Sequence, residues 1–157
     1  ETRPVLQGAR LTAFELKQDG IDAKVISDGA IGYCFYKGLI DKFICGADRI
    51  FVVDGCCVAN KVGTHTASIA AKHYGVPFYV AAPLSTFDFE HSLKEVEIEE
   101  RDPKEVTEVN GRRIVPEGVT AFNPAFDVTP PEFISAIVTE KGIIYHPFKA
   151  NLLKTLG

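Results

Sequence analysis

The stretch that decides the fold is ICGADRI at residues 44–50, followed by NKVGT at residues 60–64. The apolar residues 39–45 predict a strand, and Asp48 interrupts the pattern where a sheet meets solvent. An open α/β sheet binds its ligands at this kind of strand end. The glycine and threonine of NKVGT begin a run of small residues typical of a helix packed on a sheet. The turn before that helix presents free backbone N–H groups, which predicts a seat for an anion.

The segments on either side alternate between strand-like and helix-like patterns. Residues 77–83 form a continuous apolar run bracketed by prolines, which predicts a central parallel strand buried on both faces. Helices are predicted at about residues 11–19, 30–37, 64–74 and 130–141, and strands at about 23–26, 39–45, 50–53, 122–128 and 143–145. This alternation predicts an α/β fold with a doubly wound, mainly parallel Rossmann-like sheet.

Length and composition predict a single domain that covers residues 1–157. The chain has a mass of 17.2 kDa and is 46% hydrophobic, enough for one substantial core and too little for two. It contains no methionine. A translated chain begins with methionine, whose removal normally requires a small second residue, so we expect the sequence to be part of a longer chain with a segment before Glu1.

The charge of the chain and its cysteines indicate which partners and which cellular compartment to expect. The formal net charge is −4, the pI is near 5.6 and no run of Lys or Arg occurs, so we expect neither nucleic acid nor a membrane surface as a partner. No apolar run approaches the roughly 18 residues that a membrane span needs. The four cysteines lack CxxC spacing, which predicts no zinc site, no disulfide framework and a reducing cytoplasm.

Residues 87–118 break the alternation with charged, irregular sequence that includes the acidic stretch 97–102. Connections of this length are usually either functional or disordered. Two interpretations stay open for the acidic stretch: a lid that excludes water from the site, or solvated charge.

Five motifs, in this order, carry a family resemblance. They are TRP with QGARLTA at residues 2–4 and 7–13, GADRI at 46–50, NKVGT at 60–64, PFYVAAP at 77–83 and NPAFDVTP at 123–130. Together they resemble the C-terminal domain of the 5-methylthioribose-1-phosphate isomerase family. The superfamily also holds ribose-1,5-bisphosphate isomerase and the regulatory subunits of a translation-initiation guanine-nucleotide exchange factor.

The resemblance implies an aldose-to-ketose isomerase of methionine salvage that acts on a sugar phosphate as a homodimer, with no metal and no cofactor. Asp48 matches the family's proton donor, Gln7 matches a substrate-binding glutamine, and Asn60 and Lys61 match the pair that holds the sugar. The family's catalytic cysteine and phosphate-binding arginines lie before the TRP motif, so this chain alone is expected to be incomplete. A dinucleotide is not expected, since no GxGxxG follows a strand.

Alternatives remain for the whole chain and for single residues. The chain could be a ribose-1,5-bisphosphate isomerase or a non-catalytic regulatory subunit, although the resemblance implies that such subunits generally lack the aspartate at position 48. Asp48 and Arg49 could form only an exposed ion pair, and Lys61 could be a solvated turn residue. Asp127 is expected to cap the following helix or to contact a neighbouring subunit.

Overall fold

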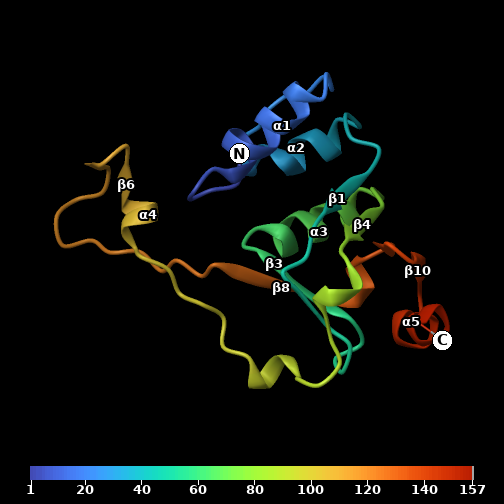
Figure 1. The fold of residues 1–157 in the computed structure, drawn as a ribbon. Helices are drawn as coiled ribbons and strands as arrows, with labels where there is room; N and C mark the ends of the chain where they lie inside the picture. The colour runs from blue at the N-terminus through green and yellow to red at the C-terminus, as the bar shows by residue number, and fades with distance from the viewer. Residues whose placement is uncertain (157) are drawn as a thin grey trace. The chain divides into compact units, whose positions relative to one another are not determined.

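The computed structural model describes residues 1–156, and the contacts within the chain divide it into two compact units (Figure 1). The first unit contains Glu1–Ile31 and Glu99–Ala125, and the second contains Gly32–Ile98 and the chain from Phe126 onward. That residues 1–157 form one C-terminal domain stays a prediction.

The first unit consists of short helices and one small hairpin. A π-helical turn at Gly8–Thr12 continues into α1 (Ala13–Gln18), which confirms the helix predicted near residues 11–19. Further along lie α4 (Lys104–Thr107) and the antiparallel strands β6 (Glu108–Val109) and β7 (Arg112–Arg113). The predicted strand at residues 23–26 is wrong: that segment is largely exposed and forms no ladder within the described chain. The Ile26 carbonyl instead accepts a hydrogen bond from the N-terminal ammonium group of Glu1 at 2.7 Å.

The second unit contains a sheet built around the predicted central strand. Its order is β1 (Phe43–Cys45), β4 (Phe78–Ala81), β9 (Ala136–Thr139) and β10 (Gly142–Tyr145). The pairs β1–β4 and β4–β9 are parallel, and β10 is antiparallel to β9. The α/β class and the mainly parallel sheet are therefore confirmed here. The expected burial of the central strand on both faces is wrong: Phe78 and Val80 are buried on one face, whereas Ala81 on the other is exposed.

The predicted helix at residues 130–141 is wrong. A single 3-10 turn, Pro131–Phe133, is followed directly by β9. β-branched residues fill β9, and such residues suit a pleated surface better than a helix. Ile137 is fully buried between β4 and β10, so tertiary packing outweighs the helix-start signal of the prolines.

A second, mixed sheet in this unit was not predicted. Its order is β5 (Phe87–Asp88), β2 (Arg49–Phe51), β3 (Cys57–Lys61) and β8 (Phe126–Thr129). Strand β3 is antiparallel to both β2 and β8, whereas β2 and β5 are parallel. The tight Asp54-Gly55 turn explains the antiparallel return, because a short connection cannot make a parallel crossover.

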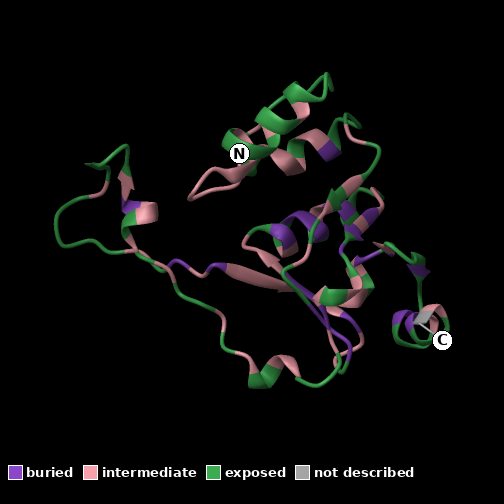
Figure 2. Cartoon of the chain, viewed as in Figure 1, coloured by how far each residue is buried: buried purple, intermediate pink, exposed green. Residues whose placement is uncertain are grey.

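The core of the second unit joins both sheets to the last helix. Its helices are α2 (Ile31–Tyr36), α3 (Thr64–His73) and α5 (Phe148–Leu156), the last of which was not predicted. Figure 2 shows the buried positions gathering on these strands and helices. The cluster contains Ile50, Val58, Phe78, Val80, Ile137, Ile144, Phe148 and Leu152. None of the helices in the described chain has the length and apolar character to cross a membrane.

Candidate functional site

Asp48 lies at the carboxyl end of β1, directly before β2. Because β1 is paired in parallel with β4, this is the strand end at which an open α/β sheet offers a ligand site. The backbone N–H of Asp48 donates to the carbonyl oxygen of Ala59 at 2.9 Å. Ala59 is followed by Asn60 and Lys61, the last residues of β3. Three predicted site residues therefore come together in the second unit.

Desolvation and charge act in opposite directions on the Asp48 carboxyl. Asp48 is exposed, but the desolvation of its carboxyl group by neighbouring atoms still raises the pKa from its ordinary value, and the Lys61 ammonium group lowers it. Lys61 therefore lies within electrostatic reach of Asp48, while its Nζ atom sits 5.1 Å from the centre of the Phe126 ring. A carboxyl group with a raised pKa holds its proton closer to neutral pH, which is what a proton donor requires.

Asn60 and Lys61 are held by the turn that leads into α3. The Asn60 Nδ2 atom donates to Thr64 Oγ1 at 2.9 Å, and the Thr64 hydroxyl donates to the Lys61 carbonyl at 2.7 Å. Gly63 has a φ of 102°, which favours glycine because a side chain is strained there. The NKVGT motif is thus a fixed turn, and its two candidate side chains start from a defined backbone.

The Asp127 carboxylate occupies the anion-binding site that the sequence predicted before α3. Asp127 lies on β8 opposite Asn60, and its carboxylate accepts the Gly63 N–H at 2.7 Å and the His65 N–H at 3.1 Å. These two donors are therefore not free for a ligand, and that expectation was wrong. Asp127 caps a helix that precedes it in the chain rather than the segment that follows. Burial raises the pKa of this carboxyl, and the two backbone bonds lower it.

Cys45 lies close to the same carboxylates. Burial, followed by the nearby Asp127 carboxylate, raises the pKa of its thiol to about 12. At neutral pH the thiol therefore stays protonated and is a poor nucleophile. Within residues 1–156, no group of three or more His, Cys, Asp or Glu side chains is arranged to hold a metal ion.

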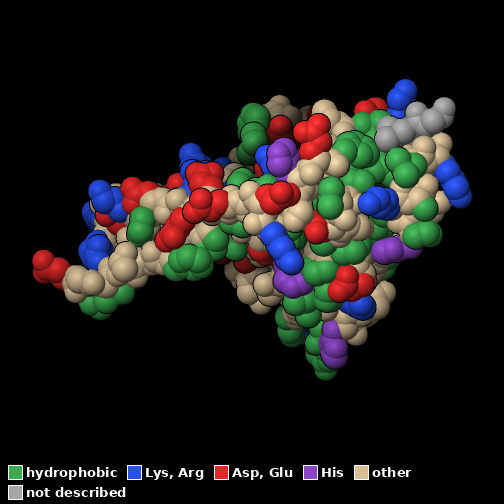
Figure 3. All heavy atoms as spheres, turned by 90° about the horizontal axis from the view of Figure 1, so that it is seen from below, with side chains coloured by type: hydrophobic (Ala, Val, Ile, Leu, Met, Phe, Trp, Pro, Cys, Tyr) green, Lys and Arg blue, Asp and Glu red, His purple; other side chains and the backbone are tan. Residues whose placement is uncertain are grey.

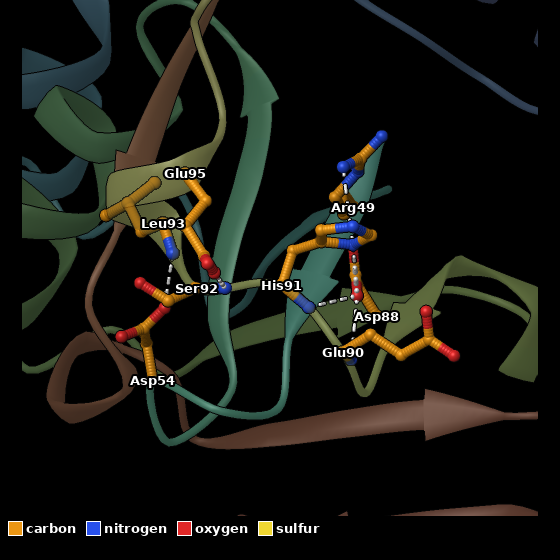
Figure 4. Close-up of polar contacts among 8 residues, drawn as sticks. All are labelled: Arg49, Asp54, Asp88, Glu90, His91, Ser92, Leu93 and Glu95. Carbon is orange, nitrogen blue, oxygen red and sulfur yellow. Dashed lines mark hydrogen bonds and ion pairs between the residues drawn. The ribbon is translucent and has the colours of Figure 1, made fainter.

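An open hollow of about 420 Å³ adjoins Asp48. Asn60 and Lys61 do not line it. Asp88 is one of its lining residues. Figure 4 shows Asp88 accepting hydrogen bonds from the neighbouring turn and facing Arg49. Sequence reasoning missed Asp88, although it directly follows the Ser-Thr-Phe that leaves β4. The lining residues are Asp48, Arg49, Ser85, Thr86, Phe87, Asp88, Phe89, Glu90 and His91.

Gln7, the fourth predicted residue, belongs to the first unit and starts its π-helical turn. Its Oε1 atom is buried and has no hydrogen-bond partner. An unpaired buried acceptor costs about 1 to 3 kcal/mol, which a donor from a ligand would recover. Gly8 beside it is required sterically, because a Cβ atom there would lie 2.6 Å from Thr2 Oγ1.

A family model described as the initiation factor 2 subunit family matches residues 1–146. The chain belongs to this family. Among its curated relatives is a protein of Thermoanaerobacter sp. (strain X514) named methylthioribose-1-phosphate isomerase. It is 57% identical over 155 residues, an alignment that covers 98% of this chain and 44% of the relative. The chain of 157 residues therefore spans about half the length of the curated relatives that it matches.

Two solved structures of the family resemble the chain closely. One is a translation initiation factor eIF-2B, subunit delta, from A. fulgidus, with 50% identity and a TM-score of 0.94. The other is 5-methylthioribose 1-phosphate isomerase from Pyrococcus horikoshii OT3, with 46% identity and a TM-score of 0.92. Each match covers 99% of this chain, and the shares of the solved chains are 45% and 43%. Because proteins with both names share the fold, the fold alone does not decide between them.

Proposed function

We propose that the complete protein is an aldose-ketose isomerase that converts 5-methylthioribose 1-phosphate to 5-methylthioribulose 1-phosphate in methionine salvage, in the cytoplasm. The observation that carries this proposal is Asp48, a carboxyl group at a parallel strand end whose pKa desolvation raises and Lys61 restrains. The relatives named methylthioribose-1-phosphate isomerase support the same conclusion.

The reaction opens the sugar ring and moves hydrogen from C2 to C1, so it needs a positioned group that gives and takes protons. In the proposal Asp48 is that proton donor. Asn60 and Lys61 hold the hydroxyl and charged groups of the sugar. Gln7, in the first unit, stays a predicted substrate-binding residue. The fixed NKVGT turn favours these roles because binding then orders few additional side chains.

Two alternatives differ in what the complete protein turns over. The similarity to a structure named eIF-2B subunit delta favours a regulatory subunit, and ribose-1,5-bisphosphate isomerase is the second alternative. Assay of the complete protein with both sugar phosphates separates the three. We expect turnover of 5-methylthioribose 1-phosphate. Turnover of ribose 1,5-bisphosphate alone would move the assignment to the sister enzyme, and turnover of neither would favour the regulatory role.

We also propose that the protein forms a homodimer through the uncovered face of the parallel sheet. The register aligns Ile44 with Tyr79 and, through Ala136, with Tyr145, so these side chains share one face. Ile44, Ile143 and Tyr145 are each more than half exposed. Parallel sheets are normally covered on both faces, so an apolar face of this kind suits burial against a second copy. Charged side chains of both signs are interspersed on the surface drawn in Figure 3.

Ile143→Glu should weaken this dimer. A charge buried without a partner costs about 3 kcal/mol, equivalent to roughly a 100-fold rise in Kd. Light scattering during size-exclusion chromatography of the complete protein measures the change. Ile69→Glu, at an exposed position of α3, is the matched control and should remain dimeric. A dimer that persists in Ile143→Glu, or a monomeric wild type, would reject this interface.

A further inference from the structure

Asp88 lines the hollow and makes polar contacts with several of its neighbours (Figure 4). Its Oδ1 atom accepts the backbone N–H groups of Glu90 at 3.0 Å and His91 at 2.9 Å. The Nδ1 atom of the His91 ring lies 3.0 Å from Oδ2. These contacts fix the turn that follows β5. The Asp88 side chain is 14% exposed, although its hydrogen-bonding partners lie at the surface.

The same carboxylate also contacts the neighbouring strand β2. Arg49 Nη1 lies 3.3 Å from Asp88 Oδ2, and Arg49 directly follows Asp48. An exposed ion pair of this kind is worth little alone. Here the backbone pairing of β2 with β5 adds to it, because the Val52 N–H donates to the Asp88 carbonyl at 2.9 Å. Asp88 therefore connects β2, which begins directly after Asp48, with the turn at residues 88–91.

Asp88 keeps its charge throughout the working pH range. The backbone N–H of His91, followed by that of Glu90, lowers the pKa of this carboxyl to about 2. An aspartate that stays ionised does not exchange protons with a substrate near neutral pH. It can serve as a constant acceptor for the groups that shape the hollow. Its role is therefore distinct from that of Asp48, whose pKa is raised.

We propose that Asp88 is a positioning residue for the isomerase reaction, holding Asp48 relative to the 88–91 turn through Arg49. This inference rests on the proposed function, because it concerns how the proton donor is held. It assigns Asp88 no contact with the reacting atoms. Misplacement of a catalytic group by about 1 Å costs on the order of 100-fold in rate, so a positioning residue has a large kinetic effect.

Asp88→Asn in the complete protein tests the proposal, because the amide keeps the size of the side chain but offers one acceptor in place of two. We expect kcat for 5-methylthioribose 1-phosphate to fall about 10- to 100-fold, with KM changed less than about threefold. The midpoint of the pH profile assigned to Asp48 should also move. If the role of Asp88 is purely structural, the variant should have a lower melting temperature. Its kcat and its pH midpoint should then be unchanged in assays well below that temperature.

Asp54→Asn is the matched control. The Asp54 carboxylate also accepts a loop N–H, that of Leu93 at 2.6 Å, but does not line the hollow (Figure 4). We expect it to lower stability and leave kcat within about twofold of wild type. Arg49→Gln removes the ion pair with Asp88 but keeps the hydrogen bonds of the 88–91 turn. It should therefore lower kcat, as Asp88→Asn does.

Each result decides a separate point. An active wild type whose kcat survives Asp88→Asn would overturn the inference alone. If Asp88→Asn does not fold, an unchanged kcat in Arg49→Gln overturns it. An equal loss of kcat in Asp54→Asn would also overturn the inference, because any lost hydrogen bond to this loop would then lower kcat. A wild type that turns over neither sugar phosphate would remove the proposed function, and the inference with it.

Discussion

Asp48→Asn is expected to lower kcat/KM of the complete protein for 5-methylthioribose 1-phosphate by about 1,000-fold, within the range that a lost acid-base group costs. The amide keeps the shape of the side chain and can donate a hydrogen bond, but it cannot give up a proton to the sugar. KM should change much less than kcat, since the side chain remains in place. Steady-state kinetics measure both.

The control for this variant is Asp41→Asn. Asp41 is an exposed residue just before β1, in the same unit as Asp48. The same chemical change there should leave kcat/KM unaltered. Full activity in Asp48→Asn would contradict the acid-base assignment. Asp48 would then be only an exposed acidic residue beside Arg49.

The pH dependence should follow the sign of the Asp48 shift. A proton donor acts in its protonated form, so kcat/KM should fall as pH rises through the raised pKa of Asp48, at a midpoint above the ordinary aspartate value of about 3.9. Lys61 lowers this pKa, so Lys61→Met should move the midpoint to higher pH. Profiles of both proteins measure the shift, and a midpoint that moves to lower pH would contradict the assigned electrostatics.

Asp127→Ala is expected to have the largest effect on stability, about 2 to 3 kcal/mol in the free energy of unfolding. The substitution leaves the N–H groups of Gly63 and His65 without their acceptor at the start of α3. Asp127→Asn retains one acceptor oxygen and should lose about 1 kcal/mol. Urea unfolding with an unchanged m-value measures these differences.

Asp127→Ala should also weaken substrate binding. Asp127 faces Asn60 across the β3–β8 pair and fixes the turn that carries Lys61, so KM should rise together with the loss of stability. Asp41→Ala is the control for a lost surface charge. If Asp127→Ala kept the wild-type urea midpoint, Asp127 would not be the cap of α3.

Local sequence signals predicted the parts of the fold whose stability depends on neighbours in the chain. The proline-bracketed apolar run predicted β4, and the small-residue pattern after NKVGT predicted α3 within one residue of its observed end. The glycine of NKVGT marked a turn because its backbone conformation disfavours other residues. The family motifs likewise pointed to Asp48, Asn60 and Lys61 before any coordinates.

Contacts between distant segments decided the rest. Residues 130–141 carry a local helix-start signal, yet pairing with β4 and burial of Ile137 make part of this segment a strand. The β2–β3 hairpin places β3 against β8, and this pairing forms the second sheet that no single segment predicted. Periodicity reports which residues are apolar, but not which strand lies beside them.

The sequence by itself determined the α/β class, the central strand and which residue types meet at its carboxyl end. The capping of α3 by Asp127 and the contact of Asp88 with Arg49 beside Asp48 became clear only from the folded chain. The physical reason is that a carboxylate acquires its role from the donors around it. Some of those donors come from segments far away in the chain, which approach it only once the sheets have formed.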